Sequence, residues 1–147
     1  MLNYEAVRVT LTTAHLALGN SGDPARFADH IDAVLCCASE IPLFPGKPGH
    51  HLRIDDGSPI GAEALERAYR FLDEQLGARH LVLVYCGHGL SRSPSVLSGY
   101  LALKQGAAPA TILASIQRLR PEVEPSAVTF RSVERYVHEI TAKLPKT

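Results

Sequence analysis

The sequence has few cysteines, no net charge and no long apolar run, and each shortage excludes a class of protein. Three cysteines are an odd number, and they lack zinc-type spacing, which is typical of a protein in a reducing compartment. Fifteen basic and fifteen acidic residues cancel, so no global field attracts nucleic acid or an anionic membrane. No window approaches the ~18 consecutive apolar residues that indicate a membrane span.

Targeting and repeat signals are also missing. The first five residues lack the basic and then apolar layout of a signal peptide, and no internal repeat or low-complexity segment is found. With 147 residues, 46% of them hydrophobic, the chain is predicted to fold as one globular domain over residues 1–147. We therefore expect a cytoplasmic monomer that binds neither nucleic acid nor membrane.

The apolar periodicity predicts strands and helices that alternate along the chain. The expected strands are 7–11, 14–20, 33–38, 51–55 and 81–84. The expected helices are 25–30, 60–76, 94–105, 111–119 and a last one that follows Ser126 and extends to Leu144. This order predicts an α/β fold with a central, mostly parallel sheet and helices on both faces. Its functional site should open at the C-terminal ends of the strands.

One stretch of the chain combines a cysteine, two glycines and an arginine between a strand and a helix. A strand-type apolar run leads to Cys86, Gly87 and Gly89 let the next loop curl, and a helix with Pro94 in its first turn begins near Arg92. In such a loop the backbone amides and the positive end of the helix dipole converge on one point, which is an anion site. The arginine adds a planar charged fork that suits two phosphate oxygens.

Cys86 lies at the floor of this predicted anion site. Cysteines at helix N-termini or beside fixed cations can have a pKa as low as ~3.5–7.5 instead of ~8.5, so we expect a thiolate near neutral pH. A thiolate that faces a bound phosphate ester is placed to attack phosphorus. The alternative is a core cysteine beside a glycine-rich turn, with Arg92 on the surface. The presence of Gly89, Arg92 and Ser93 in register on a strand–loop–helix favours the catalytic interpretation.

The segment Cys-x-x-Gly-x-Ser-Arg-Ser, residues 86–93, resembles the signature of the dual-specificity phosphatases, a branch of the cysteine-dependent protein tyrosine phosphatase superfamily. Leu-Ala-Leu-Gly-Asn at 16–20 resembles the opening strand of that family. Arg-Leu-Arg-Pro at 118–121, with Pro125 and Phe130, resembles its segment before the last helix. The resemblance covers roughly residues 14 to 140 and implies the phosphatase fold for nearly the whole chain.

The resemblance also implies roles for the residues of this segment. Cys86 would become phosphocysteine, and Arg92 would bind the phosphate together with the loop amides. Ser93 would hydrogen-bond the Cys86 sulfur and ease its departure, although it could equally cap the helix. The phosphate-binding positions are Gly87, His88, Gly89, Leu90, Ser91 and Arg92. We expect no metal and no cofactor, because the loop and the arginine supply the positive charge.

Expulsion of the leaving oxygen requires a proton donor, and an aspartate pair upstream can supply it. Asp55 and Asp56 lie on an Asp-Asp-Gly-x-Pro turn at a predicted strand end, the second of them thirty residues before Cys86. The resemblance implies that Asp56 is the general acid of the first step and the general base of the second. The alternative is that one of the pair caps the helix predicted at 60–76.

Three further residues carry open alternatives. Tyr85 stands where the family usually has histidine, and it either joins the hydrogen-bond network of the site or simply packs. His88 stands where a small residue is usual, and it either lends positive charge or turns its ring to solvent. Cys37 ends a strand that should lie beside the central one. It resembles the cysteine that forms a reversible disulfide with the nucleophile in some members, and otherwise it is a core cysteine.

These features predict a phosphatase that acts on phosphotyrosine and on phosphoserine or phosphothreonine in proteins, because a short chain without an insert before the loop favours a shallow pocket. The alternatives are a phosphatase of phosphoinositides or RNA 5′ ends, a sulfur-transfer or arsenate-reducing enzyme, and a non-catalytic phosphate-binding module. A loop without lysine disfavours the lipid, and neutral charge disfavours RNA. The presence of Cys86, Arg92 and Asp56 disfavours the non-catalytic module.

Overall fold

The central strand of the sheet is the strand that leads into Cys86. The computed structural model describes residues 10–11 and 15–144. Its sheet has the strand order β1-β2-β5-β3-β4, in which β1 pairs antiparallel with β2 and the other neighbours are parallel. The strands are β1 (Thr10–Leu11), β2 (Leu16–Gly19), β3 (Ala33–Cys36), β4 (Gly49–His51) and β5 (Val82–Tyr85).

The register of the parallel strands brings three chain segments out of the sheet at one level. Tyr85 at the end of β5 pairs with Gly19 at the end of β2 and with Cys36 at the end of β3. The residues that follow these three strand ends therefore meet at one edge. This edge is where the functional site of a parallel sheet is expected.

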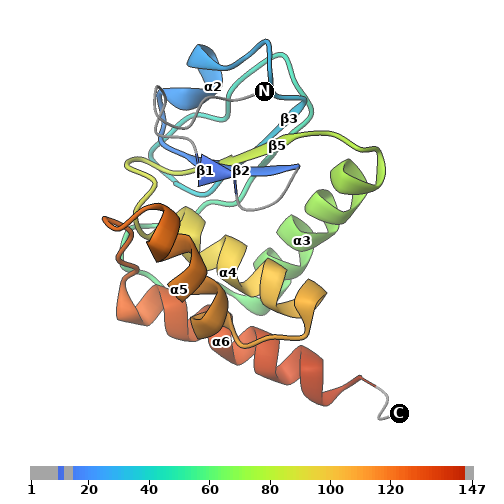
Figure 1. Cartoon of the computed structure of the whole chain (residues 1–147), viewed down its shortest axis with the longest axis vertical. Helices are drawn as coiled ribbons and strands as arrows, with labels where there is room; N and C mark the ends of the chain where they lie inside the picture. Colours follow the sequence, from blue (N-terminus) through green and yellow to red (C-terminus); the bar gives the residue numbers. More distant parts are fainter. Residues whose placement is uncertain (1–9, 12–14, 145–147) are drawn as a thin grey trace.

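Helices cover the sheet on both faces, as Figure 1 shows: α3, α4, α5 and α6 lie on one side and the short α2 on the other. Helix α4 is buried from its first residue through Ala102, which explains why its sequence has small or apolar residues on every side. It is the middle layer between the sheet and α5 and α6. The helices are α2 (Asp23–Arg26), α3 (Ala62–Gly77), α4 (Arg92–Gln105), α5 (Pro109–Leu119) and α6 (Ala127–Ala142).

The predicted fold class is confirmed, but several element boundaries were wrong. The strand predicted at 51–55 does not exist: β4 covers only Gly49–His51, and the chain then leaves the sheet. Leu52 and Ile54 are nevertheless buried, so the alternation that suggested a strand belongs to a loop with alternate residues in the core. Helix α2 is earlier and shorter than the predicted 25–30, because the turn at Asp23 already starts it.

The remaining boundary errors are smaller. Helix α3 begins after Gly61, and Gly77, expected to cap it, is its last helical residue. Helix α6 ends at Ala142 instead of Leu144, and the Ser126 side chain makes no cap hydrogen bond. Of the first predicted strand, 7–11, residues 7–9 lie outside the described residues, as does residue 14 of the second. Within the described part of the chain, no helix has the length and apolar character that a bilayer crossing needs.

Candidate active site

The predicted strand–loop–helix is present at the C-terminal edge of the sheet. Cys86 directly follows β5, and Arg92 is the first residue of α4. We call the intervening residues 87–91 the anion loop. Cys86 is 2% exposed and Ser93 is fully buried, with 3.2 Å between Cys86 Sγ and Ser93 Oγ. The sulfur and the hydroxyl that the sequence assigned to each other are therefore in contact.

Three carbonyl groups of the anion loop are held by partners outside it. In a trans peptide the N–H points away from the C=O of the same plane, and the described residues contain no cis peptide. The amides of His88, Gly89 and Ser91 are therefore directed away from these partners and remain available to an anion. The pairs are Ser21 N–H with Gly87 O (3.1 Å), Arg120 Nη2 with His88 O (3.1 Å), and Glu124 N–H with Leu90 O (2.9 Å).

Gly89 has no room for a side chain. Its φ of +72° lies in the left-handed region, and a Cβ atom there would be 2.6 Å from the carbonyl oxygen of Gly19. The end of β2 therefore packs directly against the back of the anion loop. This contact gives the Leu-Gly-Asn segment a physical role, since a larger residue at Gly89 would push the two backbones apart, and a Cβ atom at Gly19 would come within 2.6 Å of the Asp23 carboxylate.

Arg92 is held from the side by a carboxylate that sequence reasoning missed. Its Nη1 and Nη2 donate to the two carboxylate oxygens of Glu40, each at 2.6 Å, and Nη1 also donates to the carbonyl oxygen of Ile54 at 2.9 Å. The hydrogen bonds from Arg92 lower the pKa of Glu40 to about 2, and this pairing raises the pKa of Arg92. The one available signal was that Glu40 closely follows β3, at the edge where the site was expected.

These bonds determine which edge of the guanidinium can meet a phosphate. The two bonds of Nη1 use both of its hydrogens, whereas Nη2 has a second hydrogen beyond the one that points to Glu40. A two-pronged contact with an oxyanion must therefore use the Nε and Nη2 hydrogens of Arg92. With the side chain only 7% exposed, this edge is fixed in direction.

The two candidate acids lie on the loop between β4 and α3, which we call the acid loop (residues 52–59). Asp55 and Asp56 are both exposed, and neither caps the following helix, because its N-cap residue is Gly61. Asp56 is near enough to Arg92 for its charge to contribute, after that of Glu40, to the raised arginine pKa. The acid loop is fixed to the site because Ile54 O accepts from Arg92.

Tyr85 follows neither of its two predicted alternatives, whereas His88 follows the one in which its ring faces solvent. The Tyr85 hydroxyl accepts a hydrogen bond from Phe44 N–H (2.9 Å) and donates one to Pro42 O (3.2 Å), so it binds the loop after β3. The His88 ring is exposed to solvent, while its carbonyl faces Arg120. Among the described residues no cluster of three His, Cys, Asp or Glu side chains could hold a metal ion.

Cys37 directly follows β3, the strand beside β5, and is completely buried. Its N–H donates to Tyr85 O at 2.7 Å, which extends the β3–β5 register by one residue and brings Cys37 next to Cys86. Burial, and after it the charge of Cys86, raises the pKa of the Cys37 thiol. Both cysteines are free thiols.

Comparison with known proteins identifies the fold. No family model matches the sequence. The crystal structure of human DUSP28 is similar, with a TM-score of 0.79, 21% identity, and 90% of this chain and 95% of that chain covered. The crystal structure of a mouse putative dual-specificity phosphatase complexed with zinc tungstate has a TM-score of 0.81 and 21% identity, with 95% of this chain and 93% of that chain covered. The crystal structure of PTPMT1 in complex with PI(5)P has a TM-score of 0.80 and 16% identity, with 92% of this chain and 97% of that chain covered. The chain thus has the fold of the dual-specificity phosphatases, as its sequence predicted.

Proposed function

We propose that this chain is a phosphatase that hydrolyses phosphate monoesters through a phosphocysteine intermediate on Cys86. The observation that carries the proposal is the anion loop, whose carbonyls are bonded outward so that its amides can surround an oxyanion. Cys86 lies at its start and the Arg92 guanidinium at its end. Amides and a guanidinium in fixed positions stabilise the charge that develops on the equatorial phosphate oxygens.

The reaction divides into two displacements at phosphorus. In the first, the Cys86 thiolate attacks, the bond from phosphorus to the leaving oxygen breaks, and Asp56 gives its proton to that oxygen. In the second, water attacks the phosphocysteine, Asp56 takes a proton from the water, and the sulfur–phosphorus bond breaks to release inorganic phosphate. Ser93, at 3.2 Å from the sulfur, donates a hydrogen bond that stabilises the departing thiolate.

The substrate that best suits the site is a phosphorylated tyrosine, serine or threonine of a protein. Glu40 and Asp56 are exposed carboxylates close to Arg92, and they repel a substrate with several phosphates more strongly than one with a single phosphate. The anion loop contributes no lysine to offset this repulsion. PTPMT1 has been solved with a phosphoinositide, so a lipid headgroup is the second candidate for the same fold.

The test measures phosphate release from p-nitrophenyl phosphate, a phosphopeptide panel, PI(5)P and RNA with a 5′ phosphate. We expect turnover of the aryl phosphate and the phosphopeptides, and complete loss of turnover in Cys86→Ser with the fold retained by circular dichroism. Turnover that persists in Cys86→Ser would exclude the mechanism. Turnover of the lipid or the RNA alone would keep the mechanism and replace the substrate.

We also propose that Cys37 protects the nucleophile from oxidation. Neighbours in register on parallel strands have Cα atoms about 4.8 Å apart, within the ~4.4–6.8 Å that a disulfide needs. Peroxide would oxidise the Cys86 thiolate to sulfenic acid, and the Cys37 thiol would attack that sulfur, forming the disulfide and releasing water. Mass spectrometry after peroxide should find the Cys37–Cys86 pair, and dithiothreitol should restore activity.

A matched control distinguishes Cys37 from the other nearby cysteine. Cys36 pairs in register with Tyr85, so it lies on the opposite face of the sheet from Cys86, and its thiol donates to Ile41 O at 3.4 Å. Cys36→Ala should recover after peroxide as the wild type does, whereas Cys37→Ala should be inactivated irreversibly. Equal recovery of both variants would exclude the protective role.

A further inference from the structure

The residue before the nucleophile binds a loop on the other side of the sheet. Successive side chains of a strand point to opposite faces, so Tyr85 leaves β5 on the face away from Cys86. Its ring is buried, with the residue 1% exposed, and its hydroxyl makes the two hydrogen bonds to Pro42 and Phe44. Burial raises the pKa of Tyr85 well above its usual value, so the hydroxyl keeps the proton that it donates to Pro42.

The loop that Tyr85 holds carries the carboxylate that holds Arg92. We call residues 38–44 the Glu40 segment. On the N-terminal side of Glu40, two hydrogen bonds fix the segment. One joins His51 Nε2 to Ala38 O at 2.8 Å, and in the other Ser39 N–H donates to Ile54 O at 3.0 Å. On the C-terminal side it is fixed by the hydrogen bond that the Cys36 thiol donates to Ile41 O and by the two hydrogen bonds of the Tyr85 hydroxyl. The sulfur bond is the weaker type of hydrogen bond, so the tyrosine is the principal anchor on that side.

The geometry of the Arg92–Glu40 pair depends on this anchor. The Glu40 side chain is 56% exposed, and an ion pair with an exposed partner is weak when the backbone that carries it can move. Here both carboxylate oxygens lie 2.6 Å from guanidinium nitrogens, which requires the backbone of Glu40 to be held in place. A shift of the segment would turn the guanidinium and misdirect its Nε–Nη2 edge.

We propose that Tyr85 is a positioning residue for phosphate binding, which acts on Arg92 through the Glu40 segment. The proposal rests on the proposed function of the same site. It assigns to the tyrosine in the histidine position a task that differs from contact with the cysteine. The chain of contacts is continuous: the tyrosine hydroxyl bonds Pro42 and Phe44, Glu40 precedes them by two to four residues, and its carboxylate bonds Arg92.

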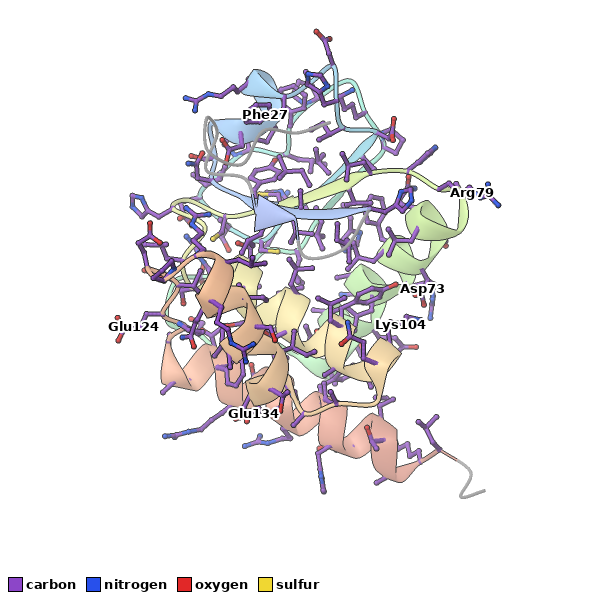
Figure 2. All side chains as sticks on the ribbon, in the orientation of Figure 1. Phe27, Asp73, Arg79, Lys104, Glu124 and Glu134 are labelled. Carbon is purple, nitrogen blue, oxygen red and sulfur yellow. The ribbon has the colours of Figure 1, made fainter. Side chains whose placement is uncertain are left out.

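The first experiment removes only the hydroxyl. Tyr85→Phe keeps the ring and should raise the KM for p-nitrophenyl phosphate and the inhibition constant of inorganic phosphate by about 3- to 10-fold, the effect of one or two lost hydrogen bonds. The kcat should fall by a smaller factor than the KM rises, because the nucleophile and the acid are untouched and only the guanidinium contact is disturbed. Tyr100→Phe is the matched control, since that hydroxyl donates to Asp73 Oδ1 at 2.6 Å. Asp73 lies on α3 and pairs with Lys104, away from the anion loop, as Figure 2 shows. The control should lower the melting temperature without a change in KM.

The second experiment tests whether Glu40 is the intermediary. Glu40→Gln should raise KM on its own, because the amide offers Arg92 one uncharged acceptor oxygen in place of two charged ones. If Tyr85 acts through Glu40, Tyr85→Phe should raise KM less than about 2-fold in the Glu40→Gln background. Effects that multiply in the double variant would overturn the proposal, as would an unchanged KM in Tyr85→Phe.

A binding measurement separates this proposal from the proposed function. Calorimetry with tungstate, a tetrahedral oxyanion like phosphate, is made on Cys86→Ser and on Cys86→Ser with Tyr85→Phe, where no turnover is needed. Weaker binding in the second protein supports the positioning role even if the wild type shows no phosphatase activity. Equal binding in the two proteins overturns it even if the wild type is an active phosphatase.

Discussion

The candidate site has two halves that are built in different ways. The buried half is one continuous stretch, from Cys86 after β5 to Ser93 in the first turn of α4, in which Cys86, Gly89, Arg92 and Ser93 are buried and the His88 side chain alone is exposed. The exposed half consists of Glu40 and Asp56, which come from the loops after β3 and β4 and reach solvent. Backbone groups can be buried once they are bonded, whereas a carboxylate that exchanges protons with a leaving group or water must remain accessible. Arg92 joins the two halves, because it begins α4 and bonds Glu40 and Ile54.

The largest expected effect comes from the buried half. Gly89→Ala would place Cβ 2.6 Å from Gly19 O in a left-handed backbone, and the nearest atoms belong to backbone that cannot rotate away. We expect a loss of about 2–4 kcal/mol of stability from strain and overpacking, and loss of at least about 100-fold in kcat/KM as the loop amides are displaced. Chemical denaturation and p-nitrophenyl phosphate hydrolysis measure the two effects.

A second glycine separates the backbone strain from the close contact. Gly106, the C-cap of α4, has a similar φ of +66°, but a Cβ atom at this position would meet nothing within 4 Å beyond its own chain neighbours. Gly106→Ala should therefore lose only about 1 kcal/mol and keep full activity. If the two variants behaved alike, the close packing of β2 against the anion loop would have no special importance.

The same division explains what the sequence could predict. Cys86, Gly89, Arg92 and Ser93 are local in sequence, and the strand, loop and helix around them have clear apolar and glycine signals, so the buried half and the fold were predictable. The Arg92–Glu40 pair joins residues 52 positions apart and depends on the path of an irregular loop, for which no periodicity exists.

Two other misses have the same origin. The acid loop alternates buried and exposed residues without forming a strand, because Leu52 and Ile54 pack into the core from a loop. The partner of the Tyr85 hydroxyl lies more than forty positions earlier in the chain, in the Glu40 segment, and only the parallel register of β3 and β5 brings the two together. Sequence patterns predict contacts within one helix or strand, whereas these contacts depend on how separate elements pack against one another.

The next effect, of intermediate size, distinguishes Asp56 of the exposed half from its neighbour Asp55. Asp56→Asn should lower kcat for phenyl phosphate by about 10²–10³-fold without weakening phosphate binding, because the proton donor is lost and a negative charge near Arg92 is removed. The loss should be smaller for p-nitrophenyl phosphate, whose leaving group needs less protonation. Asp55→Asn should change kcat less than about 3-fold, since the carbonyl of Asp55 accepts from Ser58 N–H in the turn and its carboxylate is not part of the proposed chemistry. Equal losses in both variants would contradict the assignment of Asp56.

The smallest effect concerns the pH dependence of the pair that joins the halves. The Glu40 pKa of about 2 lies below the ~4.3 that is usual for a glutamate in an unfolded chain. The Arg92–Glu40 pair therefore contributes its full stability at a pH above ~4.3. This contribution is lost as the pH falls from ~4.3 through about 2. Glu40→Gln should therefore lower stability by the same amount at about pH 5 and pH 7, and the difference from wild type should shrink only at lower pH. Above about pH 5, the midpoint of the acid limb in the pH profile of kcat/KM should be the same in Glu40→Gln as in the wild type.

Glu66→Gln is the control for this last prediction. It removes an exposed pair with Arg70, at 3.1 Å and four residues apart on α3, which does not join separate parts of the fold. Such a pair contributes about 0.3–0.5 kcal/mol at most, so this variant should resemble the wild type in urea denaturation at about pH 5 and pH 7. A shifted acid limb in Glu40→Gln, with Glu66→Gln unchanged, would mean that Glu40 titrates during turnover. The exposed half would then hold a second proton-transfer group, and Glu40 would no longer be only the partner that orients Arg92.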